Sequence, residues 1–228
     1  MLEMLTPKQV RIFGAFLAKP FGELTYRQIK EFSEEKSNSV IQNAISRFAE
    51  EELITRKRVG NVILLAAELE NPDTMSYFGI LANERLPKIA RLCLRTIRRE
   101  IHQLSFASVV VFGSYAKGEE KKDSDLDIAV FVATEEDKKN CRLALNSAEL
   151  KCVIPLDAHV FTKSEMLEML KDKDENLGKQ IARKHLAVHN PSAFYSIIRE
   201  GMEHGFRVVY QTGRERTEAR GHHIHDKR

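Results

Sequence analysis

The sequence is poor in cysteine, and none of its cysteines belongs to a CxxC pair. Three occur in 228 residues, at Cys93, Cys141 and Cys152. An odd number without paired spacing argues against a disulfide framework and against a zinc ribbon. Because each cysteine lies among apolar residues, we expect three small buried side chains in a reducing, cytoplasmic compartment.

Long apolar runs are also missing. A membrane-spanning helix needs about 20 mostly apolar residues, and the most apolar stretches here, Val62–Ala67 and Ser108–Phe112, are much shorter. The N-terminal residues lack the basic and then apolar segments of a secretion signal. We therefore expect neither a membrane partner nor secretion.

An excess of one charge is lacking as well. Lys and Arg number 36 against 33 Asp and Glu, which leaves a net charge of +3. This sum predicts no partner, since the distribution of the charge along the chain matters more. At 43% hydrophobic residues, the chain can bury the core of one medium domain or two small ones.

Residues 1–70 carry the start signals of three short helices. Thr6 and Thr25 are each followed three residues later by glutamine, which is the capping-box pattern. A third helix is expected to begin at Ser37 or two residues later. The spacing of apolar residues predicts that Phe32, in the second helix, points into the core.

Two β-prone runs flank Gly60-Asn61, which predicts a hairpin. Three helices followed by a hairpin resemble a winged helix-turn-helix domain, in which the third helix reads nucleic acid and the hairpin forms the wing. The charge of this region is balanced, and the same fold could serve only protein contacts or dimerisation. The side chains that could reach DNA or RNA are Arg56, Lys57 and Arg58 on the wing and Asn43 and Arg47 on the third helix.

Residues 71–73, Asn-Pro-Asp, form a turn and a plausible domain boundary. A helical pattern then runs from about Met75 to Leu104, with an apolar stripe that could pair two copies of the chain as a homodimer. Basic residues recur on this segment at helical spacing and predict a positive stripe facing solvent or a polyanion. They are Lys88, Arg91, Arg95, Arg98 and Arg99.

Gly113 and Ser114 directly follow a β-branched run, residues 107–112, that predicts a buried strand. A glycine at this point lets the backbone approach a ligand closely. A serine at the start of a helix offers a hydroxyl and an N–H to a phosphate.

Asp125 and Asp127 lie two residues apart where a second strand, residues 128–132, is predicted to begin. Both carboxylates therefore point to the same side of the chain, where they repel each other unless a divalent cation lies between them. One or two carboxylates together with substrate phosphates suit Mg²⁺.

A third carboxylate is expected from a neighbouring strand. Asp157 lies in an alternating segment and should share one face with His159. Asp172 and Asp174 are rival candidates, but they lie in a polar helix end or loop, and Asp157 is preferred. His159 is interpreted as a polar neighbour of that aspartate more readily than as a direct participant.

These residues resemble the nucleotidyltransferase superfamily that shares the DNA polymerase beta-like fold. Its pattern is Gly-Ser-x-Ala-x-Gly, a gap of five residues, Ser-Asp-x-Asp and a later strand aspartate. Residues 113–118 and 124–127 match it at every defined position, and Asp157 matches the third acid less specifically. The resemblance covers about residues 75–170, and the minimal prokaryotic nucleotidyltransferases are closest in size.

The resemblance implies transfer of a nucleotide from an NTP to an acceptor hydroxyl, with release of pyrophosphate. It implies two Mg²⁺ ions, held by the catalytic carboxylates Asp125, Asp127 and Asp157. It also implies triphosphate binding by Gly113, Ser114, Ser124 and Lys117. For Lys117, a solvated side chain on the motif's helix is an equally good interpretation.

The predicted fold class is α+β. We expect a winged helix over residues 1–70, a nucleotidyltransferase domain with a small mixed β-sheet packed by helices over 71–212, and a disordered basic tail over 213–228. The alternative function is that of a DNA-binding transcriptional regulator, or an antitoxin-type protein, whose transferase-like domain binds nucleotide or a partner protein without turnover.

The C-terminal part holds most of the remaining histidines. His185 and His189 have a spacing that can bind zinc, but an exposed helix face is the preferred interpretation. A last helix is expected to begin at Pro191, followed by a possible strand at 207–210. Three histidines of the tail could pick up metal, namely His222, His223 and His225.

Overall fold

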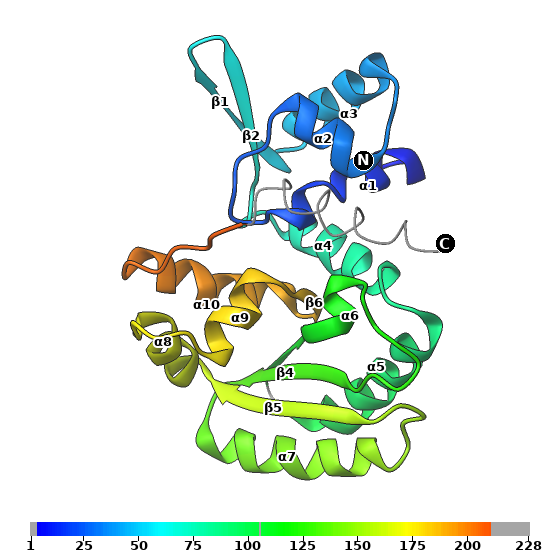
Figure 1. Cartoon of the computed structure of the whole chain (residues 1–228), viewed down its shortest axis with the longest axis vertical. Coiled ribbons are helices and arrows are strands. Elements are labelled where there is room, and N and C mark those ends of the chain that lie inside the picture. Colours follow the sequence, from blue (N-terminus) through cyan, green and yellow to red (C-terminus); the bar gives the residue numbers. More distant parts are fainter. Residues whose placement is uncertain (1–3, 105, 211–228) are drawn as a thin grey trace, which may run out of the picture.

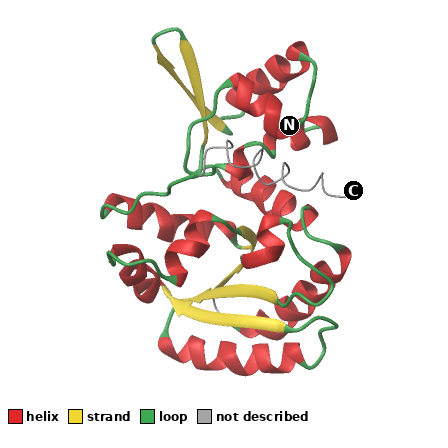
Figure 2. Ribbon diagram, in the orientation of Figure 1, coloured by secondary structure: helices red, strands yellow, loops and turns green. Residues whose placement is uncertain are grey.

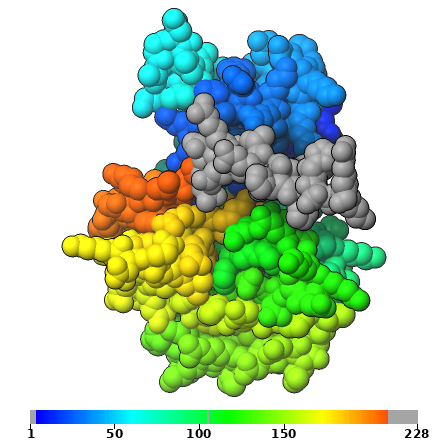
Figure 3. All heavy atoms as spheres, in the orientation of Figure 1, coloured from blue at the N-terminus to red at the C-terminus, as the bar shows by residue number. Residues whose placement is uncertain are grey.

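The computed structural model describes residues 4–104 and 106–210. Figure 1 shows two parts along the long axis, a group of N-terminal helices with a projecting hairpin and a β-sheet packed by helices. The space-filling view in Figure 3 shows the hairpin standing out from the N-terminal helices. The predicted α+β class is confirmed.

The N-terminal elements begin where the capping signals predicted. They are α1 (Pro7–Phe13), a 3₁₀ turn (Phe16–Ala18), α2 (Tyr26–Ser33), α3 (Asn38–Glu50), β1 (Ile54–Val59) and β2 (Val62–Ala67). Thr6 and Thr25 each form a complete capping box, and the Ser37 hydroxyl caps α3. The prediction for Phe32 was wrong, since it is 41% exposed. Because α2 buries the face of Ile29 and Ser33, the Phe32 ring lies at the rim beneath the Lys19 ammonium.

The hairpin is joined to the helices through a short backbone bridge. β1 and β2 pair antiparallel around Gly60-Asn61 as predicted. Leu24, in the segment before α2, exchanges both backbone hydrogen bonds with Leu65 of β2, at 2.7 and 2.9 Å. The base of the hairpin is therefore fixed to the helical core, and its tip projects into solvent (Figure 1).

The single helix expected from Met75 to Leu104 is divided in two. α4 (Pro72–Glu84) ends before Pro87, and α5 (Lys88–Glu100) begins after it. Pro87 has no N–H to continue a helix, and its ring excludes the helical conformation from the residue before it. α4 contacts both parts of the molecule, since the Phe78 ring lies 5.7 Å from Phe13 and 5.7 Å from Tyr195.

The basic stripe of α5 is shorter than predicted. Arg98 points inward and donates to the Asn83 side-chain oxygen at 2.9 Å. Burial lowers the pKa of its guanidinium below the ordinary value. The exposed basic residues of this helix are Lys88, Arg91, Arg95 and Arg99.

The second part is built around a mixed four-stranded sheet of order β5-β4-β3-β6. Figure 2 shows strands of this sheet in yellow among red helices. The strands are β3 (Ala107–Val111), β4 (Leu126–Val132), β5 (Leu156–Thr162) and β6 (Leu186–His189). β4 and β5 run parallel, and β3 pairs antiparallel with both β4 and β6. The packing helices are α6 (Gly113–Lys117), α7 (Glu135–Glu149), α8 (Lys163–Lys171), α9 (Leu177–Arg183) and α10 (Pro191–Glu203).

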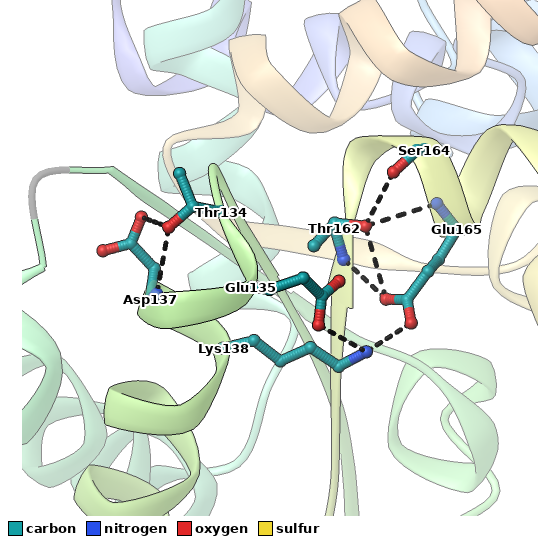
Figure 4. A network of polar contacts seen from close by, with 7 residues as sticks. All are labelled: Thr134, Glu135, Asp137, Lys138, Thr162, Ser164 and Glu165. Atoms are coloured by element: carbon teal, nitrogen blue, oxygen red, sulfur yellow. Dashed lines mark hydrogen bonds and ion pairs between the residues drawn. The ribbon is translucent and has the colours of Figure 1, made fainter.

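The carboxyl ends of β4 and β5 are joined by a polar network (Figure 4). Thr134 and Thr162 cap α7 and α8. Lys138 of α7 is buried and pairs with Glu165 of α8 and, at 3.9 Å, with Glu135. This network fixes the end of the sheet opposite the aspartates at the starts of β4 and β5.

The expectation of three unpaired cysteines was wrong for two of them. Cys93 of α5 and Cys152, in the loop before β5, form a disulfide with their Cα atoms 5.2 Å apart. They are 59 positions apart in sequence, so only the packing of α5 beside α7 brings them together. Among the described cysteines Cys141 is unpaired, and burial raises the pKa of its thiol to about 12.

The chain end differs from the prediction in one respect. α10 begins at Pro191 as expected, but residues 207–210 form no strand. The Tyr210 hydroxyl instead accepts a hydrogen bond from the Phe21 backbone N–H at 3.0 Å. The tail over 213–228, with its three histidines, lies outside the described residues. Within them, no helix is long and apolar enough to cross a membrane.

Candidate active site

Gly113 lies against the carboxylate of Asp127. It follows β3 after one intervening residue, Phe112, and has a φ of +63°, which a residue with a side chain adopts only with strain. A Cβ atom placed there would lie 1.9 Å from Asp127 Oδ2 and 2.6 Å from its Cγ. Two separate features therefore require glycine at position 113. They are the positive φ of its backbone and the Asp127 carboxylate, which fills the space of a Cβ atom.

Asp127 lies opposite Asp157 in the parallel register of β4 and β5. Adjacent strands are about 4.8 Å apart, and side chains of directly paired residues leave the same face of the sheet. The two carboxylates therefore come from neighbouring strands to one surface, as the alternation of the sequence predicted for each strand.

The environment of Asp127 favours a positive ligand. Burial raises the pKa of its carboxyl above the ordinary value, and the charges of Asp157 and Asp125 raise this pKa further. A hydrogen bond from the backbone N–H of Ser114 and the nearby His159 ring lower it in part. A cation bound between the carboxylates would remove the repulsion that raises this pKa.

The remaining motif residues are more exposed. Asp125 and Lys117 face solvent. The Ser124 hydroxyl accepts a hydrogen bond from the Lys121 backbone N–H at 2.8 Å, so it holds the turn that leads into β4. The family resemblance implied that this serine binds the triphosphate. In the structure, its hydroxyl forms a hydrogen bond with the loop before β4.

His159 lies beside Asp157, with its Nε2 atom 3.2 Å from Oδ1 of the carboxylate. The rival acids are elsewhere, since Asp172 ends α8 and accepts a hydrogen bond from the Asp174 backbone N–H in the following turn. In the described part of the chain, no three His, Cys, Asp or Glu side chains are gathered as a ready metal-binding cluster.

His185 and His189 do not lie on an exposed helix face, as the sequence interpretation had it. His189 ends β6, and His185 precedes that strand. His185 is buried, and its ring contacts the Ile181 carbonyl at 2.9 Å and the Tyr195 hydroxyl at 3.3 Å. Desolvation lowers its pKa to about 4, so it is a neutral core histidine. The interpretation failed because a four-residue strand interrupts the helical pattern.

The residues proposed for nucleic-acid contact are largely engaged within the chain. Arg56 donates to the Ile45 carbonyl of α3 at 2.8 Å, and Arg58 donates to the Gly60 carbonyl at 3.1 Å. Lys57 lies 3.9 Å from Glu23, and Arg47 pairs with Glu51 on its own helix. Asn43 is exposed on α3.

Sequence reasoning missed the aromatic surroundings of the site. The His159 ring lies 6.0 Å from Phe112 and 6.0 Å from Phe161. Strand alternation could have placed Phe161 on the face of His159, because the two residues are two apart. The approach of Phe112 depends on the order of the strands, which the sequence does not display.

Residues 94–203 match a family model described as a nucleotidyltransferase domain. The match spans all four strands of the mixed sheet together with the Gly113 turn and the three aspartates. This part of the chain is therefore similar to nucleotidyltransferase domains, and the similarity suggests transferase activity. A search of curated proteins and a search of solved structures each found no match.

Proposed function

We propose that the protein is a Mg²⁺-dependent nucleotidyltransferase. It would move a nucleoside monophosphate from an NTP to an acceptor hydroxyl and release pyrophosphate. The observation that carries this proposal is the arrangement of Asp127 between Gly113 and Asp157. The two carboxylates come from paired strands, and the Gly113 backbone lies directly against one of them, within the matched residues. This arrangement suits a metal-bound triphosphate.

The donor set fits Mg²⁺. This ion is usually bound through one or two carboxylates together with substrate phosphates and water, so a complete cage of protein ligands is not required. Asp125, Asp127 and Asp157 would hold it. When bound, the metal would stabilise the charge on the oxygens that enter and leave phosphorus.

The chain's own residues would act in defined positions. Gly113 and Ser114 would receive the triphosphate, and the exposed Lys117 could extend toward it. Asp157 would hold the acceptor side and accept the proton of the hydroxyl. The bond from the acceptor oxygen to the α-phosphorus would form as the bond to the bridging oxygen breaks, and pyrophosphate would leave with that oxygen.

Label transfer tests this proposal. The purified chain is incubated with each of the four α-labelled NTPs, with and without Mg²⁺, and with cell extract as the source of acceptors. The variant Asp127→Asn is the control for contaminating enzymes. Label transfer and pyrophosphate release that need both Mg²⁺ and Asp127 support the proposal. Equal transfer by wild type and Asp127→Asn contradicts it.

We also infer that residues 1–70 form a winged-helix unit that contacts nucleic acid. The support is the order of the elements and the Leu24–Leu65 bridge. Through this bridge, the segment between α1 and α2 pairs with the edge of the hairpin. The polar face of α3 is exposed at Gln42, Asn43 and Ser46. We place the boundary to the catalytic unit at 70–71, although α4 contacts both sides.

A gel shift at two salt concentrations tests this second proposal. The double variant Lys57→Ala/Arg58→Ala removes two wing charges while leaving Arg56, whose contact with α3 is structural. The matched control, Lys139→Ala/Arg142→Ala, removes two exposed charges from α7. We expect weaker binding and a reduced salt dependence for the wing variant alone, since each lost phosphate contact lowers the slope by about 0.9. Equal binding by both variants excludes the wing.

The alternative function, a regulator that binds nucleotide or a partner protein without turnover, shares the same metal and nucleotide site. Nucleotide binding without label transfer in any acceptor mixture would favour it. A homodimer through α5, where Ile89 and Leu92 are exposed, is a further part of the proposal. Light scattering of wild type and Leu92→Glu tests it, with a change in mass expected only if α5 pairs.

A further inference from the structure

Asp157 lies on the edge strand of the sheet and is weakly held. Its side chain is 56% exposed. Among the described residues, its strand β5 pairs with one other strand, β4. Within the described residues, one ion-pair contact reaches its carboxylate, from His159 Nε2 at 3.2 Å. Without this contact, the carboxylate could rotate about its side-chain bonds and turn away from Asp127.

His159 is itself held in place by two aromatic rings. Phe161 stacks nearly parallel to the imidazole, with an interplanar angle of 3° and a centroid distance of 6.0 Å. The Phe112 ring lies 6.0 Å from the imidazole, at an interplanar angle of 50°. Because the side chain is 36% exposed, these rings restrict the imidazole without burying it.

Phe112 connects this arrangement to the glycine turn. It directly precedes Gly113, and its backbone N–H donates to the Asp127 carbonyl at 3.0 Å. His159 belongs to the edge strand that carries Asp157, and its ring also lies beside Phe112, next to the glycine of the motif.

We propose that His159 is a positioning residue of the active site. Its Nε2 atom, 3.2 Å from Asp157 Oδ1, holds that carboxylate on the surface it shares with Asp127, ready for a divalent cation. This inference rests on the proposed function for the role of Asp157. The sequence interpretation took His159 for a polar neighbour of that aspartate, and the proposal gives it a defined role. Partners that orient metal-binding carboxylates typically change metal affinity or activity by about 10- to 100-fold when removed.

Two variants separate the polar contact with Asp157 from the packing of the ring. His159→Phe keeps a ring between Phe112 and Phe161 and removes the donor, while His159→Gln removes the ring and offers an amide N–H at a similar reach. Three properties are measured: the melting temperature, the affinity for Mn²⁺ by electron paramagnetic resonance with a non-hydrolysable triphosphate, and kcat and KM for the NTP.

We expect His159→Phe to melt near wild type, to bind Mn²⁺ about 10-fold more weakly and to lose at least about 10-fold in kcat, with the KM for the NTP little changed. His159→Gln should recover most of the Mn²⁺ affinity. Mn²⁺ affinity and kcat of His159→Phe within twofold of wild type would overturn the proposal. So would a folded His159→Gln that is as weak as His159→Phe.

The Mn²⁺ measurement keeps this inference distinct from the proposed function. If the wild type transfers no nucleotide but binds Mn²⁺ in a His159-dependent way, the positioning role stands and the transferase proposal fails. If the wild type is active and His159→Phe is unchanged, the reverse holds. A wild type without Asp127-dependent Mn²⁺ binding would overturn both.

Discussion

A Cβ atom on Gly113 would lie 1.9 Å from the Oδ2 atom of Asp127. The turn after β3 and the first residues of β4 are therefore built around one another. The motif Gly-Ser and the motif Asp-x-Asp, which are separated in sequence, describe a single contact.

This contact predicts unequal effects of two glycine substitutions. Gly113 and Gly118 have similar φ values of +63° and +70°, but only Gly113 has neighbours within 4 Å of its Cβ position among the described residues. Gly118→Ala should therefore cost about 1 to 2 kcal/mol of unfolding free energy from backbone strain alone. Gly113→Ala should cost more and displace Asp127.

Urea unfolding and Mn²⁺ binding of the two variants check this prediction. We expect Mn²⁺ affinity to fall in Gly113→Ala and to stay near wild type in Gly118→Ala. Similar unfolding free energies and similar Mn²⁺ affinities for the two variants would show that the Gly113–Asp127 contact does not shape the site.

The raised pKa of Asp127 predicts that its charge destabilises the metal-free fold. Asp127→Asn should melt at least about 2 °C above wild type at pH 7, while reducing transfer activity at least about 100-fold. The folded-state pKa is raised above the ordinary value of 3.8, so the wild type loses stability as pH rises through that window. The difference in stability between wild type and Asp127→Asn should vanish near pH 3, where Asp127 is protonated in both the folded and the unfolded chain.

Melting curves of both proteins between pH 3 and pH 7, without divalent cations, measure this difference. Asp125→Asn is the matched control, because Asp125 is exposed. If Asp127→Asn melts at or below wild type at pH 7, burial and repulsion at this position are not the dominant effects.

Ligand binding should reverse the destabilisation. Mg²⁺ with a non-hydrolysable triphosphate should raise the melting temperature of wild type, by a free energy of about 2.7 kcal/mol at 100 times the dissociation constant. The same mixture should stabilise Asp127→Asn less, because the carboxylate that the cation neutralises is gone. An equal shift for both proteins would place the nucleotide elsewhere.

The network at the other end of the sheet gives a prediction about stability alone. Lys138→Met removes a side chain that is 11% exposed and pairs with Glu165, and should cost about 1 to 2 kcal/mol. Lys139→Met, at a 75% exposed position on the same helix, should cost little. Metal affinity should stay unchanged in both variants.

The pH dependence of this difference has the opposite sign to that of Asp127. Although burial raises the pKa of Glu165, the hydrogen bonds from Lys138 and from the Thr162 backbone bring it below the ordinary value of 4.5. The stabilisation is present at pH 7 and is lost as pH falls through the folded-state pKa. A difference between Lys138→Met and wild type that persisted undiminished at pH 2 would contradict this origin.

Local signals predicted the parts of this fold that depend on neighbouring residues. The capping boxes at Thr6 and Thr25 and the turn at Gly60 appear as expected, since they depend on a few adjacent residues. The break at Pro87 was readable from the proline, but the apolar stripe running through it obscured the signal. The contacts of Cys93 with Cys152 and of His185 with Tyr195 depend on distant packing that no local pattern contains.

The central claim is nucleotide transfer by the Asp127 site, and label transfer measures it most directly. The account predicts that wild type with Mg²⁺ moves label from an α-labelled NTP to an acceptor and releases pyrophosphate in step, while Asp127→Asn does neither above background. Transfer that is equal in the two proteins, or absent from wild type in every acceptor mixture, would contradict it.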